Sequence, residues 1–115
     1  YNVAVGYQAG VGVTTGIQNT LVGSSAGDAL TTGSFNVVLG KSALSTEDAH
    51  GRNVAIGYAA LYGQDAGVDA YNTAVGFGAG EAVTTGVQNT IIGANAGDGI
   101  SLGADNVAPV QNQLL

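Results

Sequence analysis

Two short motifs resemble catalytic signatures. Gly23-Ser24-Ser25-Ala26-Gly27 fits the Gly-x-Ser-x-Gly nucleophile elbow, in which the central Ser lies on a tight turn beside a His and an acid. The chain has one His, His50, and it falls in the turn of another repeat. Gly40-Lys41-Ser42 resembles the end of a phosphate-binding loop, but Phe35 stands where that motif requires Gly. We therefore expect no enzyme.

Carboxylates recur at one position and could offer oxygen ligands to Ca²⁺. Asp28, Glu81 and Asp98 each follow a pair of small residues on a Gly-rich segment. Each copy supplies a single carboxylate, and the Gly-Gly-x-Gly-x-Asp pattern of calcium β-rolls is missing from the sequence. We expect turn-capping or solvated carboxylates here, with no metal and no cofactor.

Paired threonines suggest an ice-binding face as an alternative function. Thr14-Thr15, Thr31-Thr32 and Thr84-Thr85 occupy equivalent positions of three copies of a repeat. The other three full copies hold different pairs, namely Asp48-Ala49, Asp65-Ala66 and Ser101-Leu102. Because a broken array is a poor template for ice, turn or strand-edge threonines are favoured, and binding of ice or another small ligand stays the alternative.

Composition limits the partners. The 115 residues include 20 Gly and no Cys, and 2 basic against 8 acidic residues give a net charge of −6. This charge argues against nucleic acid and against an acidic membrane surface as partners. With 45% hydrophobic and only 9% charged residues, the chain should fold as one small domain.

A repeat explains most of these motifs. Asn followed by three mostly apolar residues and Gly recurs every 17 residues, with one step of 19. The copies start at Asn2, Asn19, Asn36, Asn53, Asn72, Asn89 and Asn106, and the Gly column contains Gly6, Gly23, Gly40, Gly57, Gly76 and Gly93. An Ala follows each of these Gly residues three positions later. A further Gly comes ten positions after the column Gly, except where His50 replaces it.

Each copy predicts a short β-strand. Val, Ile and Thr favour strands in triplets such as Val3-Ala4-Val5, and the following Gly can turn the chain with positive φ. We also predict a second short strand in the middle of each copy, for example around 11–14 and 81–84. Stacked copies give an all-β fold, a parallel β-solenoid or β-roll of 17-residue coils. We place it at residues 1–108, with 109–115 as its end or the start of a linker, because Pro109 cannot donate to the ladder.

Alternation within the strand predicts an oligomer. The outer residues of each triplet share one face and the middle residue points the opposite way, yet both faces are apolar. A coil has one interior, so we expect the middle residues, such as Ala55 and Ala74, to form an oligomer interface. The column Asn should bond to the turn backbone and to the Asn of the next coil. Tyr7, Tyr58 and Phe77 either pack at the interface or stack on sugars.

The motif Asn-(Val/Thr)-Ala-(Val/Ile)-Gly, with a downstream Ala-Gly and Thr-Thr-Gly, resembles the repeats of bacteriophage tail fibres and tailspikes. It is also similar to the head repeats of trimeric autotransporter adhesins, although those repeats are somewhat shorter. The resemblance implies a left-handed parallel β-roll, a homotrimer, and a fibre on a virion tail or cell surface that attaches to a host through a glycan or protein receptor.

The 19-residue copy marks a candidate receptor contact. Between Gly67 and Asn72 it holds four residues, 68–71, where other copies hold two. An insertion at a solenoid corner should bulge outward, because the ladder on either side keeps its register. We therefore expect the candidate contact residues to gather there. They are Tyr62, Asp65, Val68, Asp69 and Tyr71.

Overall fold

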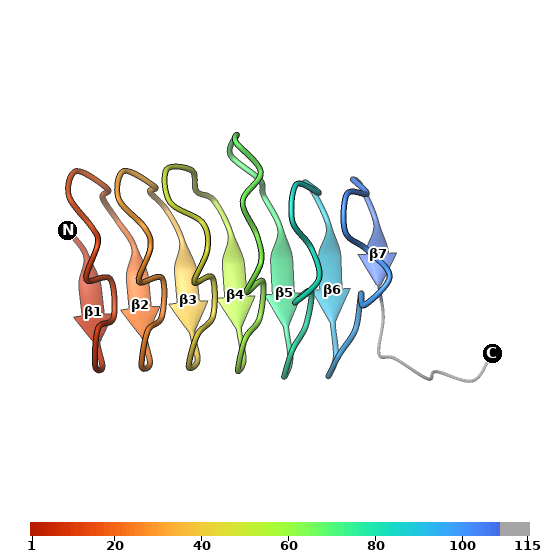
Figure 1. The fold of residues 1–115 in the computed structure, drawn as a ribbon, viewed down its shortest axis with the longest axis horizontal. Coiled ribbons are helices and arrows are strands. Elements are labelled where there is room, and N and C mark those ends of the chain that lie inside the picture. Colours follow the sequence, from red (N-terminus) through yellow and green to blue (C-terminus); the bar gives the residue numbers. More distant parts are fainter. Residues whose placement is uncertain (109–115) are drawn as a thin grey trace.

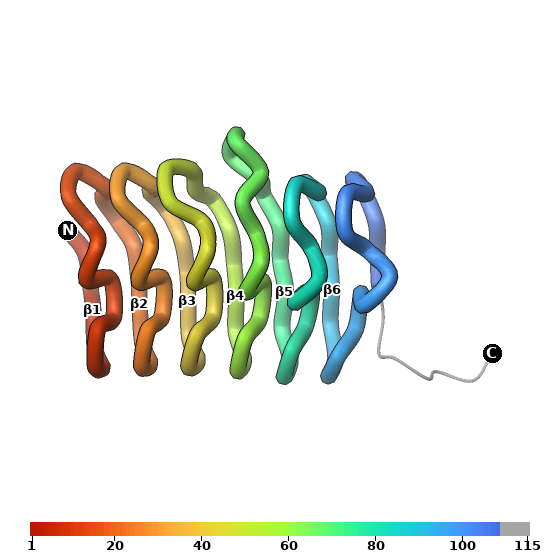
Figure 2. Tube along the Cα trace, viewed as in Figure 1, coloured from red at the N-terminus to blue at the C-terminus, as the bar shows by residue number. Residues whose placement is uncertain are grey.

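In a computed structural model, seven parallel strands form one sheet, in the order in which they occur along the chain (Figure 1). The structure describes residues 1–108, so the predicted end of the solenoid at 109–115 lies outside the described residues. The strands are β1 (Val3–Val5), β2 (Thr20–Val22), β3 (Val37–Leu39), β4 (Val54–Ile56), β5 (Thr73–Val75), β6 (Thr90–Ile92) and β7 (Val107–Ala108). The chain makes one circuit between successive strands, and these circuits stack as the coils of a solenoid (Figure 2). The predicted parallel β-solenoid with coils of about 17 residues is thus confirmed. Within residues 1–108, no helix reaches the length and hydropathy needed to cross a bilayer.

The register of the sheet brings equivalent residues of successive copies together. Val3 pairs with Thr20, and Thr20 pairs in turn with Val37. The 19-residue copy does not disturb this register, since Val54 still pairs with Thr73. At about 4.8 Å per step, the seven strands span roughly 29 Å.

The predicted second strand is wrong. Residues 11–14 and 81–84 form turns, in which Val11 N donates to Gln8 O and Val13 N donates to Gly10 O. Gly10 has a φ of 59°, which is the left-handed region and breaks an extended segment. Of the apolar residues that suggested a strand, Val83 is completely buried whereas Val11 is 67% exposed.

The predicted orientation of the strands is also wrong. The middle residues of β2 to β6 are completely buried inside the coil, not on an oligomer face. These residues are Leu21, Val38, Ala55, Ala74 and Ile91. They pack against the Ala column, which includes Ala43 and Ala60, and form one continuous core. The outer residues of the triplets therefore face away from the core, as the half-exposed Leu39 does.

The column Gly after each strand turns the chain with φ values from 120° to 140°. A side chain is excluded there by the next coil as well. A Cβ on Gly57 would lie 2.3 Å from the carbonyl oxygen of Gly76. Both the backbone conformation and the close stacking of coils therefore require Gly at this position.

Candidate functional site

The Asn column forms a ladder of side-chain hydrogen bonds along the solenoid. The backbone N of each Asn donates to Oδ1 of the Asn in the preceding coil, as Asn36 does to Asn19 at 3.0 Å. The side-chain amide usually donates within its own coil, as Asn19 Nδ2 does to Gly33 O at 2.9 Å. Asn89 follows the same pattern with Gly103 O. In the regular coils the amide thus joins two coils and closes its own, so that its polar atoms are paired although the side chain is buried.

Of the six full coils, two depart from this pattern, namely coil 3 (residues 36–52) and coil 4 (residues 53–71). Asn36 Nδ2 donates to Asn19 Oδ1 at 3.1 Å instead of to its own coil, and Asn53 Nδ2 has no hydrogen-bond partner. In coil 3, His50 replaces the Gly whose carbonyl accepts this bond in regular coils. The ladder is therefore least regular where His50 and the insertion occur.

The interior of coils 3 and 4 is also filled differently. In the other full coils the fourth residue after the column Gly is Gly and the seventh is apolar, as with Gly27 and Leu30. In coils 3 and 4 the fourth residue is Leu44 or Leu61, and both are fully buried. A Cβ at Gly27 would lie 2.9 Å from Leu30 Cδ1, so the two fillings exclude one another.

This exchange leaves two polar side chains in the core, Glu47 and Gln64, and neither is exposed. They occupy the position where the other full coils hold Val, Leu or Ile. Gln64 Oε1 accepts a hydrogen bond from Asn72 Nδ2, whereas Gln64 Nε2 has no partner. Neither residue was predicted as functional from the sequence, although a polar residue in an apolar column of the repeat is a detectable signal.

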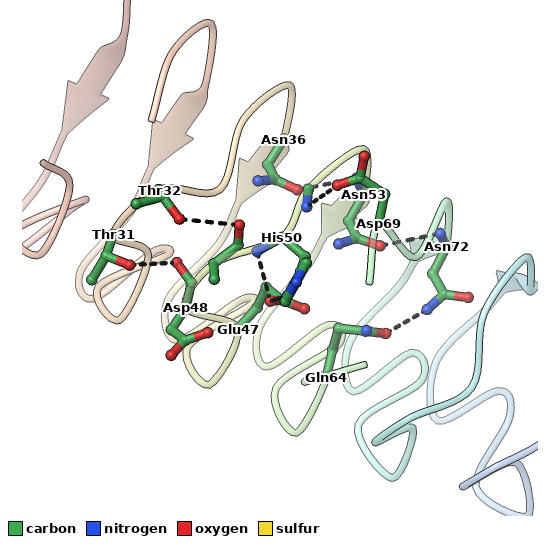
Figure 3. Close-up of polar contacts among 12 residues, drawn as sticks. Thr31, Thr32, Asn36, Glu47, Asp48, His50, Asn53, Gln64, Asp69 and Asn72 are labelled. Atoms are coloured by element: carbon green, nitrogen blue, oxygen red, sulfur yellow. Dashed lines mark hydrogen bonds and ion pairs between the residues drawn. The ribbon is translucent and has the colours of Figure 1, made fainter. Parts of the chain in front are cut away.

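Glu47 lies against His50. Oε1 of Glu47 accepts a hydrogen bond from His50 N at 3.0 Å and lies 3.4 Å from His50 Nδ1 (Figure 3). The side chain of His50 is 31% exposed and reaches the surface. The exposed Asp48 completes a group whose ligand atoms all lie within 4.8 Å of one another. Among residues 1–108, three potential metal ligands thus gather here, whereas the column of Asp28, Glu81 and Asp98, where we expected no metal, forms no such group.

The corner formed by the 19-residue copy protrudes between β4 and β5 (Figure 1). Asp69 accepts hydrogen bonds from Arg52 Nε at 2.8 Å and from Gly51 N at 2.9 Å. The Arg52 hydrogen bond, and then that from Gly51, lower the pKa of the Asp69 carboxyl below its usual value near 3.8. The Arg52 guanidinium also lies over the rings of Phe35 and Tyr71, at 4.7 and 5.8 Å from their centroids. These contacts fix the base of the corner to coil 3.

The five predicted contact residues come from two parts of the coil. Val68 and Tyr71 are more than half exposed at the corner, and Asp69 is used in the ion pair with Arg52. Tyr62 and Asp65 lie earlier in the coil. Tyr62 N donates to Ala59 O in the turn after β4, and Asp65 N donates to Thr84 O of the next coil.

The residues of the apparent catalytic motifs and the threonines take part in coil stacking. Ser25 lies in the turn after β2 with a φ of 57°, and its N donates to Tyr7 O of the preceding coil. Lys41 is exposed in the turn after β3. The hydroxyls of Thr14 and Thr31 donate to carbonyl oxygens of the next coil, those of Thr31 and Asp48. No pocket is found among residues 1–108.

The outer face of the sheet carries a row of exposed apolar side chains. Six of them are at least 41% exposed, namely Val3, Val5, Val37, Leu39, Ile92 and Val107. Val54 and Ile56 continue the row with partly buried side chains. We call this row the outer apolar stripe. Tyr58 and Phe77, which follow the column Gly of two adjacent coils, stack with ring centroids 4.8 Å apart.

The fold and the Asn ladder define the class of this chain, a parallel β-solenoid repeat protein. No protein-family model, curated protein or solved structure matches it.

Proposed function

We propose that the chain is a shaft segment of a homotrimeric fibre, on a virion tail or a cell surface, that serves in attachment to a host. The observation that carries this proposal is the outer apolar stripe. Exposed apolar surface of this extent on a folded protein is typical of a surface that a partner covers. The protein would then act as a structural and adhesive element and not as an enzyme.

The periodicity of the stripe favours further copies of the same chain as the partner. Its side chains lie on β1, β3, β4, β6 and β7, in register with a coil spacing of about 4.8 Å along the solenoid. A second copy presents the same spacing, so that apolar side chains can pack coil against coil over the full length. Three copies, each giving its stripe to a common axis, are favoured by the resemblance to trimeric fibres.

Host attachment, if it involves this segment, would use the protruding corner. Val68 and Tyr71 expose an apolar and an aromatic side chain beside an ion pair, and aromatic rings with a polar neighbour suit both glycan and protein receptors. The ice-binding alternative has less support. The hydroxyl groups of Thr14 and Thr31 already donate hydrogen bonds to the next coil, and Asp48 interrupts the row of threonines.

Binding of labelled protein to cells tests the attachment role. We expect saturable binding to a host strain, and at least about tenfold weaker binding when Val68→Ser is combined with Tyr71→Asn. Asn tolerates the left-handed conformation of Tyr71, which has a φ of 54°, so the coil should still form. The control is Tyr7→Asn, which removes an exposed aromatic ring elsewhere. Unchanged binding of the double variant would show that the corner is not the receptor site.

A further inference from the structure

The group formed by Glu47, Asp48 and His50 has no role in the shaft proposed above. We propose that these three side chains bind one divalent transition-metal ion of the zinc type in each chain. Glu47 supplies a buried carboxylate oxygen, His50 its Nδ1 atom, and Asp48 a carboxylate from the solvent side.

The distance between two of the ligand atoms fits such an ion. Glu47 Oε1 lies 3.4 Å from His50 Nδ1. In a tetrahedral zinc site with bonds of about 2.0–2.1 Å, two ligand atoms are about 3.4 Å apart. The third ligand atom lies within 4.8 Å of the others. Asp48 is exposed, so rotation of its side chain can bring the carboxylate into the coordination sphere.

Unpaired polar atoms at the same place favour a bound cation. Glu47 is completely buried and its Oε2 has no hydrogen-bond partner, and neither has the buried Nδ1 of His50. A buried carboxylate without a cation is costly, and a bound cation offsets that cost. The core does not require a charge here, because four of the other five full coils fill the position with Val, Leu or Ile.

The ligand set indicates which class of metal fits. Two carboxylates and a neutral imidazole carry a charge of −2, which one divalent cation neutralises. An imidazole nitrogen suits Zn²⁺ and similar ions, whereas Ca²⁺ and Mg²⁺ prefer oxygen ligands alone. The partly exposed His50 ring and the exposed Asp48 leave a path for the ion from solvent.

The single histidine makes a direct test possible. Zn²⁺ is titrated into the chain, made without a polyhistidine tag, while the ring resonances of His50 are followed by NMR. We expect these resonances to shift and to saturate at one equivalent of Zn²⁺ per chain. With Zn²⁺ at about 100 times its Kd, the melting temperature should rise by about 5 °C or more. Ca²⁺ and Mg²⁺ at the same concentration should leave both readouts unchanged.

Matched variants distinguish Zn²⁺ binding at this site from Zn²⁺ binding at an exposed imidazole alone. Glu47→Gln keeps the shape of the side chain and removes a buried charge, so the coil should fold. It should weaken Zn²⁺ binding by about 100-fold, since even residues that only support metal ligands contribute 10–100-fold. His50→Asn should abolish binding, whereas Glu81→Gln, which alters an exposed carboxylate in another coil, should leave it intact.

Two results would overturn the proposal. One is the absence of a shift in the His50 resonances at one equivalent of Zn²⁺. The other is equal Zn²⁺ affinity of the wild type and Glu47→Gln, which would mean adventitious binding at an exposed imidazole. Neither result would affect the fibre proposal, because the outer apolar stripe does not include these residues.

Discussion

The backbone nitrogen of Asn89 lies 2.8 Å from Oδ1 of Asn72, and the two residues are one coil apart. The same Asn72 side chain donates from Nδ2 to Gly86 O at 2.8 Å. Both Asn residues are completely buried. One amide therefore satisfies two backbone groups that water cannot reach, and this explains why a largely apolar interior keeps a column of Asn.

Asn72→Ala should consequently destabilise the fold. It leaves Asn89 N and Gly86 O buried without a partner, and each unpaired group costs about 1–3 kcal/mol. We expect the free energy of unfolding in urea to fall by about 2 kcal/mol or more. Lys41→Ala, at an exposed position, is the control and should change it little. Equal urea midpoints for Asn72→Ala and the control would refute a stabilising ladder.

Gly57→Val should be far more damaging than Tyr58→Ala. The Gly57 φ of 129° is unfavourable for a β-branched residue, and a Cβ would lie 2.3 Å from Gly76 O. Tyr58 is 47% exposed, and its loss removes one aromatic stack. Thermal denaturation followed by circular dichroism should show a large fall in melting temperature for Gly57→Val alone. Similar melting temperatures would contradict the turn geometry.

Leu44→Ala tests whether Leu44 fills the core of coil 3, at a position where most other coils hold Gly. Leu44 is completely buried, and truncation of such a side chain typically costs about 2–5 kcal/mol. Leu102→Ala, at a residue that is 71% exposed, is the matched control and should have little effect. A cost for Leu44→Ala no greater than that of the control would mean that Leu44 is not part of the core.

The ion pair at the corner should make stability depend on pH in acid. The pKa of Asp69 is lowered in the folded state, so its contribution is present above the unfolded value, near pH 4, and is lost as the pH falls through the lower folded value. The melting temperature of the wild type should therefore exceed that of Asp69→Asn at pH 6. The two should converge once the pH has fallen well below that folded value. The effect should be small, because both Arg52 and Asp69 are partly exposed. A difference that persists unchanged in strong acid would mean that the carboxylate charge is not its cause.

The repeat allowed the strands, their parallel stacking and the turn Gly to be predicted, because stacked identical coils place identical residues in one environment. It did not reveal which side of the strand faces the core. Val38 and Leu39 are both apolar, and only the position of the Ala column relative to the strand decides that Val38 is inside. The second strand was predicted wrongly because the apolar residues of that segment did not reveal its backbone conformation. Residues in the left-handed conformation, such as Gly10, interrupt the segment. The site at Glu47 depends on contacts with His50 that the repeat pattern does not encode.

Substitutions at the neighbouring residues Val38 and Leu39 test most directly whether the core and the oligomer interface lie on opposite faces of the strand. Val38→Glu places a charge in the protomer core and should prevent folding. Leu39→Glu places the charge on the outer apolar stripe, where Leu39 is 50% exposed in the single chain. The Leu39→Glu protein should therefore keep its β-sheet circular dichroism but lose its oligomeric state. Unfolding of both variants to the same extent would contradict the separation of the two faces.

The mass of the assembly in solution tests the central claim most directly. Multi-angle light scattering of the wild type at micromolar concentration should give three times the chain mass of 11.2 kDa, and Leu39→Glu should give the mass of one chain. A monodisperse, folded wild-type monomer would contradict the proposal that further copies cover the outer apolar stripe.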